Sequence, residues 1–319
     1  MLRNLNEFVG RMTGFKVRRC DEPIAAIAPQ LTAFELARSE LGDGSMLVAD
    51  IGARFGAEAS WYRLRPLARV AGFEPDEVEC DRLNARAAEG ERFYPVALGR
   101  TPGRADLYVT AEPGCSSLYP PSKAVTDRYP HTRQRLLLQK VSSVEVSTLD
   151  EWVSKTSTER IDFMKIDTQG SELDILIGAG AVLDDCLGVE VEVEFSPLYD
   201  GQPVFSDVDE HLRSRGFHLW HLNNPVHFTE TSKPTPSHRL GLIRYGAIEV
   251  LHETGAGRLM WADAVYFRDW RSLTSRRDCL LLASLLEAAG DYAGAAEAIM
   301  HAETFGETLV PEARLKHTA

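Results

Sequence analysis

The sequence is poor in cysteine, and none of its five cysteines belongs to a recognisable pair. They stand singly along 319 residues, without the C-x-x-C spacing of zinc sites and redox motifs. An odd number of scattered cysteines argues against the disulfide framework that small secreted domains use. We therefore expect a reducing compartment, the cytoplasm.

Long apolar runs and an excess of basic residues are also missing. No stretch reaches the ~20 apolar residues of a membrane-spanning helix, so we expect no integral membrane segment. The first residues carry charges with no apolar core between them, so we expect no secretory signal. The net charge of −12 opposes nucleic acid as a main partner, because binding to a phosphate backbone requires a positive field.

The chain does contain a regular alternation of strand-like and helix-like segments. This alternation predicts an α/β fold, with parallel strands joined by crossover helices. Strands are expected at residues 45–52, 69–75, 91–98, 161–167, 188–195, 217–222 and 262–269. Two irregular stretches interrupt the pattern, a predicted hairpin and loop at 99–147 and a predicted inserted hairpin within 225–260.

The pattern also predicts three parts of the chain. Residues 1–44 form a helical lead, residues 45–270 the main domain, and residues 271–319 a helical extension. The extension is predicted to contain two short helices joined near Gly290 and Asp291. This helical hairpin is expected either to dock on the main domain or to serve as an arm for homo-oligomerisation.

Three helix starts within the main domain carry an S/T-x-x-D/E signature. Thr148, Ser171 and Ser206 each precede an acidic residue by three positions. A hydroxyl at such a position can accept a hydrogen bond from a free backbone N–H of the first turn. We therefore predict that these three residues are N-caps.

The segment VADIGARFGAEA, residues 48–59, follows the first predicted strand and resembles a ligand-binding turn. A dinucleotide-binding turn would read G-x-G-x-x-G, but here the first position is Asp50. A carboxylate repels a pyrophosphate and attracts an ammonium group, which S-adenosylmethionine carries. Gly52 lets the backbone turn tightly beside a ligand.

Glu74 ends the second predicted strand, 24 positions after Asp50 (74 − 50). An acid about 20 residues beyond the glycine turn hydrogen-bonds ribose hydroxyls in Rossmann-type folds. Nicotinamide and methionine-derived cofactors share that requirement. The spacing therefore predicts an adenosine ligand, and Asp50 favours S-adenosylmethionine over NAD.

Four segments together resemble the FkbM-type methyltransferases over about residues 45–270. These segments are VADIGARFG, AGFEPD, IDFMKIDTQGSELDIL and EVEFSPLYDGQPVFSDVDEHLRSRGFHLWHL. The resemblance implies a Rossmann-like sheet of seven mostly parallel strands with helices on both faces. It also implies S-adenosylmethionine-dependent O-methylation of a hydroxyl on a sugar, a glycan or a secondary metabolite.

The resemblance further implies a set of residues that bind the cofactor. They are Asp50, Gly52, Ala53, Arg54, Gly56, Glu74, Ala97, Asp167 and Gln169. The turn in this family usually reads D-x-G-A-N-x-G, and Arg54 stands here in place of the Asn. Arg54 could pair with the cofactor carboxylate, with Asp50 or with Glu74, or it could block the site.

Methyl transfer to a hydroxyl needs a group that removes a proton, placed at the carboxyl ends of the strands. Asp167 ends a predicted strand there and is the first candidate for the base, with Glu194 and His221 as further candidates. Gln169 could hydrogen-bond the cofactor or the acceptor. Lys165 is expected to pair with Asp167 or Glu194, or to reach past the sheet edge.

Several alternatives remain open from the sequence alone. Asp167, Glu194 and His221 could form an oxygen-rich Mg²⁺ site, but no spacing signature supports it, and no metal ligand is assigned. Glu192 is expected on a solvated or ion-paired face of its strand. The chain could also be an inactive cofactor-binding module or a nicotinamide-dependent oxidoreductase. Acceptor specificity is expected in residues 110–137 and 223–260.

Overall fold

A computed structural model describes residues 32–56, 64–158, 160–230, 240–245, 248–253 and 257–306. The described residues belong to one compact unit that begins at Thr32. Most of the helical lead predicted at 1–44 lies outside the described residues. Its described part is α2 (Thr32–Leu41).

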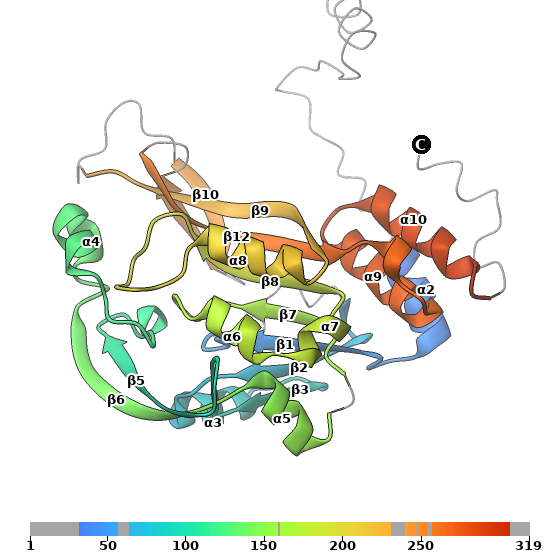
Figure 1. Ribbon diagram of the computed structural model, residues 1–319, viewed down its shortest axis with the longest axis horizontal. Helices are drawn as coiled ribbons and strands as arrows, with labels where there is room; N and C mark the ends of the chain where they lie inside the picture. Colours follow the sequence, from blue (N-terminus) through green and yellow to red (C-terminus); the bar gives the residue numbers. More distant parts are fainter. Residues whose placement is uncertain are drawn as a thin grey trace, which may run out of the picture. The chain divides into compact units, whose positions relative to one another are not determined.

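A sheet of seven strands organises this unit (Figure 1). The strand order is β3-β2-β1-β7-β8-β12-β9, in which β12 runs antiparallel to both neighbours and the other pairs are parallel. The strands are β1 (Met46–Ile51), β2 (Ala68–Phe73), β3 (Glu91–Tyr94), β7 (Phe163–Ile166), β8 (Gly188–Glu194), β9 (Phe217–Phe228) and β12 (Arg258–Arg268). The predicted α/β fold with a mostly parallel seven-stranded sheet is confirmed.

Helices cover both faces of the sheet. Phe73 lies on one face, in an apolar core shared with residues of four helices. These helices are α5 (Leu149–Thr156), α6 (Glu172–Gly178), α7 (Ala181–Asp185) and α8 (Phe205–Ser214). Neighbouring strand residues point to opposite faces, so Gly72 faces the other side. There it lies against the ring of Phe93, which packs with Cys80 and Leu83 of α3 (Glu77–Asn84).

The strand predicted at 91–98 is split between two sheets. β3 ends at Tyr94, and Ala97–Leu98 form β4 in a second sheet of order β4-β6-β5. Pro95 stands between them and has no N–H to continue the ladder. The predicted hairpin is β5 (Gly103–Thr110) with β6 (Leu138–Ser147), and its loop holds three short helices: η2 (Pro113–Cys115), α4 (Lys123–Arg128) and η3 (Pro130–Thr132).

The inserted hairpin predicted within 225–260 is confirmed as β10 (Leu240–Tyr245) paired antiparallel with β11 (Ile248–Glu253). β9 is longer than predicted, because it continues through Pro225 to Phe228. It is the last strand in the sheet order, and an edge strand tolerates a proline since one side needs no hydrogen bonds.

Of the predicted helix caps, Thr148 is confirmed, since its hydroxyl accepts a hydrogen bond from the N–H of Glu151 at 3.1 Å. Ser206 is not a cap, because α8 already begins at Phe205. The carboxylate of Asp207 instead accepts from the N–H of Val204 at 2.8 Å. An acid inside the first turn, and not a serine hydroxyl, thus stabilises the start of this helix.

The C-terminal segment forms the predicted hairpin, α9 (Arg276–Ala288) and α10 (Tyr292–Glu303), preceded by η4 (Trp270–Ser272). It docks within the compact unit, since the buried carboxylate of Glu287 accepts hydrogen bonds from the N–H groups of Ala33 and Phe34 in α2. Arg277 binds Asp162, which directly precedes β7. The limits of the three predicted parts remain a prediction.

Within the described parts of the chain, no helix is both long enough and apolar enough to cross a membrane.

The ion pair between Arg277 and Asp162 is expected to anchor α9 to the sheet. Asp162 is 1% exposed and accepts from both guanidinium ends, at 2.8 and 3.1 Å, and from the N–H of Leu47 at 2.8 Å. We expect Asp162→Ala to lower the free energy of unfolding by about 2–3 kcal/mol, because it removes two charge-assisted hydrogen bonds of Arg277 and leaves the N–H of Leu47 without its acceptor.

Urea unfolding measures this change. The matched control is Asp43→Ala, which removes the partner of Arg38 in a pair whose side chains are 42% and 58% exposed. That loss is expected to stay below about 1 kcal/mol. Equal losses in the two variants would contradict an anchoring role for Asp162.

Candidate functional site

The strand order reverses between β1 and β7, since the chain runs from β1 toward β3 on one side and from β7 toward β8 on the other. Open α/β sheets bind ligands outside the carboxyl ends of the strands at such a reversal. Two loops meet there. A Cβ placed on Gly52, after β1, would overlap the carbonyl oxygen of Asp167, after β7.

The glycine turn after β1 is bonded to the end of β2. Gly52 and Gly56 both have left-handed backbones, with φ of 87° and 90°, which glycine adopts without strain. The N–H groups of Gly52 and Ala53 each donate to the carbonyl of Phe73 at 3.0 Å. This double contact brings Glu74, the next residue, beside the turn as the sequence predicted.

Arg54 lies over the acids that follow β2. Its guanidinium is 3.5 Å from Oε1 of Glu74 and 3.4 Å from Oδ2 of Asp76. Among the partners considered for Arg54, the structure therefore shows Glu74, and it adds Asp76. Glu74 is buried, and burial raises its pKa, although the N–H of Asp76 and the charge of Arg54 partly oppose the rise.

Asp50 and Asp167 lie near the same ammonium group. Asp50 is 1% exposed and pairs in register with Lys165 of β7. The Nζ atom of Lys165 is 4.0 Å from Oδ1 of Asp50 and 3.4 Å from Oδ2 of Asp167. The predicted pairing of Lys165 with Asp167 is thus observed.

Asp167 and Gln169 are part of one hydrogen-bonded network at this edge. Nε2 of Gln169 donates to Oδ1 of Asp167 at 2.9 Å and to Oε2 of Glu192 at 2.7 Å. Burial raises the pKa of Asp167, but Lys165 and the Gln169 amide outweigh it, and the pKa lies below its usual value. Glu192 is 8% exposed, so of the two positions predicted for it, solvated or ion-paired, the solvated one is wrong.

Sequence reasoning missed two residues that hold this loop. The buried carboxylate of Glu172 accepts from the N–H groups of Thr168 at 2.8 Å and Gly170 at 2.9 Å, while the predicted cap Ser171 makes no side-chain capping bond. Tyr199 places its hydroxyl 3.2 Å from Oε1 of Gln169. Glu172 lies inside the KIDTQGSE segment, but Tyr199 carries no comparable signal in the sequence.

The other predicted catalytic residues are placed differently. Glu194 ends β8 at this edge but is 2% exposed, and burial together with Glu172 raises its pKa well above the usual value. His221 pairs with Val265, four positions along β12 from Trp261, the partner of Glu194. Four strand residues span about 13 Å, so His221 lies away from the carboxyl edge and is not brought to Asp167.

One alternative left open by the sequence was a Mg²⁺ site at this edge. Among the residues that the structure describes, no group of three or more His, Cys, Asp or Glu side chains is arranged to hold a metal ion. Asp167, Glu194 and His221 therefore do not form the Mg²⁺ site considered above.

Ala97 is buried and pairs with Val146 in the second sheet, not in the seven-stranded sheet.

The segment predicted to carry acceptor specificity lies next to this network. Cys115, Tyr129 and Leu136 form a small apolar core with Tyr199 and with residues at the ends of β9 and β12. The hydroxyl of Ser117 donates to the backbone carbonyl of Gln169 at 2.6 Å. Of the second predicted segment, 223–260, residues 231–239, 246–247 and 254–256 lie outside the described residues.

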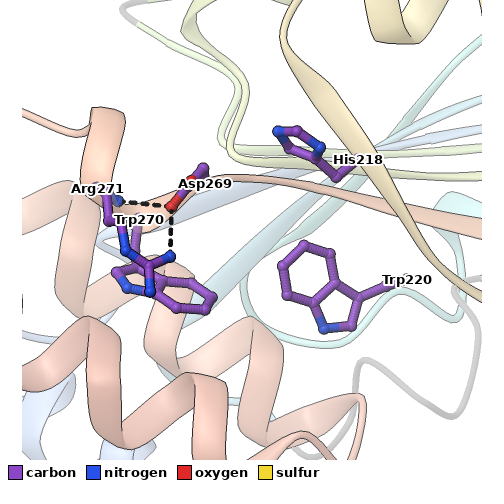
Figure 2. A pocket seen from close by; sticks show the side chains of 5 residues that line it. All are labelled: His218, Trp220, Asp269, Trp270 and Arg271. Carbon is purple, nitrogen blue, oxygen red and sulfur yellow. Dashed lines mark hydrogen bonds and ion pairs between the residues drawn. The ribbon is translucent and has the colours of Figure 1, made fainter.

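A separate pocket occurs at the other end of the sheet (Figure 2). Its lining comes from the start of β9 and the segment after β12: His218, Trp220, Asp269, Trp270 and Arg271. Here Phe267 of β12 pairs with Gly188, the first residue of β8, so the pocket is at the amino ends of the parallel strands. It is therefore distinct from the site formed around Asp167.

The contact between Gly52 and Asp167 predicts a severe effect of a single methyl group. Gly52→Ala is expected to lower the free energy of unfolding by roughly 3 kcal/mol or more, from left-handed backbone strain plus the overlap. Gly42 is the matched control, since it has the same φ of 87° and a Cβ added to it would meet no atom within 4 Å. Gly42→Ala should cost only about 1–2 kcal/mol; similar losses in urea unfolding would contradict the close contact.

Comparison with known proteins gives one family profile and one relative by sequence. The profile of the methyltransferase FkbM domain matches residues 50–219. The 2-O-methyltransferase NoeI of Sinorhizobium fredii is 29% identical over 161 residues, which are 49% of this chain and 66% of that protein. The match thus spans slightly less than two thirds of this relative.

Solved structures give only weak likenesses. A TehB-like SAM-dependent methyltransferase from Corynebacterium glutamicum is 12% identical, covering 74% of this chain and 86% of its own, with a TM-score of 0.32. The N-terminal domain of EvdMO1, in the presence of SAH and D-fucose, is 9% identical, covering 83% and 96%, also with a TM-score of 0.32. Such scores are too low to support an inference. The FkbM profile, by contrast, covers more than half of the chain, and the protein belongs to the FkbM methyltransferase family.

Proposed function

We propose that this protein binds S-adenosylmethionine at the carboxyl edge between β1 and β7 and methylates a hydroxyl group of a sugar, a glycan or a secondary metabolite. The observation that carries the proposal is the pair of buried acids, Asp50 and Glu74, on either side of the Gly52 turn. Membership of the FkbM methyltransferase family supports it. The similarity to NoeI, a 2-O-methyltransferase, supports oxygen as the atom that is methylated.

The residues at this edge fit the chemical groups of that cofactor. Asp50 and Asp167 supply negative charge for its ammonium group, and Glu74 supplies an acceptor for ribose hydroxyls. Gly52 and Gly56 leave the turn without side chains where the backbone must approach a ligand. S-adenosylmethionine carries no phosphate, so the carboxylate of Asp50 at the start of the turn does not repel it.

When bound, S-adenosylmethionine supplies a methyl group on a sulfonium, which an acceptor oxygen displaces in line. The protein must then hold the acceptor and take its proton. We propose that Asp167 accepts the proton of the acceptor hydroxyl. Its side chain is 33% exposed and is oriented by Lys165 and Gln169. Because its pKa is lowered, Asp167 is ionised at neutral pH and ready to accept.

The setting of the reaction is part of the same proposal. Because the cysteines are few and scattered, we place the reaction in the cytoplasm. We propose a small-molecule or glycan acceptor, recognised by residues 110–137 and 223–260, and no nucleic-acid partner. Homo-oligomerisation would use the helical hairpin of α9 and α10.

Calorimetric titration tests the cofactor. We expect binding of S-adenosylmethionine and S-adenosylhomocysteine and none of NAD or NADP, because Asp50 repels a pyrophosphate. Turnover is then followed as S-adenosylhomocysteine release over a panel of hydroxyl-bearing sugars and secondary metabolites. Binding of NAD alone would establish an oxidoreductase, and cofactor binding without turnover on any acceptor would favour an inactive module.

Asp167→Asn tests the assignment of the base. We expect the rate of methyl transfer to fall by about 10²–10⁴-fold, the usual contribution of a general base. The affinity for S-adenosylhomocysteine should change by less than about tenfold, since Asp50 remains beside the ammonium group. Asp150→Asn, at an exposed position on α5, is the matched control and should keep full activity. An active Asp167→Asn variant would assign the base elsewhere.

Arg54→Asn tests whether this residue competes for Glu74. Because Arg54 pairs with Glu74, its removal should free that carboxylate for ribose and tighten S-adenosylhomocysteine binding by about three- to tenfold, as expected for a partly exposed ion pair. Arg82→Asn is the control, since Arg82 pairs with Glu79 instead. Weaker binding in Arg54→Asn would show that Arg54 grips the cofactor, and turnover appearing only in that variant would show that Arg54 blocks the native site.

A further inference from the structure

One amide group is shared by two carboxylates at the carboxyl edge of the sheet. Nε2 of Gln169 carries two hydrogens, and it donates one to Asp167 at 2.9 Å and one to Glu192 at 2.7 Å. Two carboxylates that share one donor nitrogen lie close together. Their mutual repulsion favours a state in which one of them keeps a proton.

The surroundings of the two acids differ, and they favour Glu192 as the acid that keeps a proton. Asp167 has the ammonium of Lys165 at 3.4 Å and is one third exposed. Glu192 is 8% exposed, and burial followed by the charge of Asp167 raises its pKa well above the usual value. Three further acids raise it as well, Glu194 of β8, Asp263 of β12 and Glu172 of α6. The cation of this network, Lys165 of β7, lies beside Asp167.

Gln169 itself is held in one orientation. Its backbone is left-handed, with φ of 61°, a conformation that residues other than glycine rarely adopt. Ser117 donates a hydrogen bond to the backbone carbonyl of Gln169. The hydroxyl of Tyr199 lies 2.8 Å from the backbone carbonyl of Cys115 and 3.2 Å from Oε1 of Gln169. The amide nitrogen faces the acids because the ionised carboxylate of Asp167 can only accept hydrogen bonds.

We propose that Glu192 is a positioning residue for methyl transfer: it carries a proton, shares the Gln169 amide with ionised Asp167, and so orients the one carboxylate that accepts the proton of the acceptor. This rests on the proposed role of Asp167 as the base. The acceptor's proton passes to Asp167 and not to Glu192, whose carboxyl group is already protonated. Glu192 acts only through Gln169 and touches neither cofactor nor acceptor.

The proposal predicts how stability depends on pH, without any need for turnover. Unfolded Glu192 ionises in the ordinary glutamate range, whereas the folded protein keeps the proton to higher pH. The folded state therefore binds more protons in that window, and stability falls as the pH rises through it. Glu192→Gln has no proton to lose, so its stability relative to wild type should increase as the pH rises above the ordinary glutamate range.

Urea unfolding of the two proteins through and above that range measures this difference. A constant difference between wild type and Glu192→Gln would overturn the protonated state of Glu192. This outcome does not depend on finding an acceptor, so it is separate from a failure of the proposed function, which would appear as absent cofactor binding or turnover.

Kinetics test the positioning role. Glu192→Gln preserves size and hydrogen bonding and should keep kcat within about threefold at neutral pH, while Glu192→Ala should lose about 10–100-fold because Asp167 loses its alignment. Wild type should lose activity as the pH rises and Glu192 ionises, and Glu192→Gln should not. If Glu192→Ala does not fold, the pH profile of Glu192→Gln still decides the question.

The matched control is Glu287→Gln, a second buried glutamate that lies in α9 and accepts two backbone hydrogen bonds. This variant should show the pH–rate profile of wild type. A loss of activity with rising pH that is the same in wild type and Glu192→Gln would overturn the proposal, as would a Glu192→Ala variant with full kcat.

Discussion

The contact between the loops after β1 and β7 is the constraint on which the site depends. Gly52 has no room for a side chain because the carbonyl of Asp167 occupies that space. The same turn donates two hydrogen bonds to Phe73 and thereby brings Glu74 alongside. Three strands, β1, β2 and β7, thus present their terminal acids at one edge only because the glycine turn stays narrow.

The features that the sequence could predict are those with a local cause. Apolar runs of strand length between helical segments indicated all seven strands of the main sheet. The cap at Thr148 and the turn between α9 and α10 were likewise local. In each case a few adjacent residues determine the backbone, whatever lies around them.

The features that escaped prediction depend on contacts between distant segments. Pro95 divides one apolar run into two strands of different sheets, and the register of β9 against β12 removes His221 from the edge. The alternation around Glu192 indicates a polar face, but only the packing of β8 beside Gln169 turns that face into a buried one. Periodicity gives the direction of a side chain and not what covers it.

The position of β7 between two anchors has a mechanical consequence. This strand has four residues, with Asp162 immediately before it and Asp167 immediately after it. One end is tied to α9 through Arg277, and the other carries the carboxylate assigned to chemistry. This short strand therefore connects the helical hairpin at one end of the sheet with the acids at the other. Any displacement of α9 along the axis of β7 would therefore reach Asp167 through only four residues.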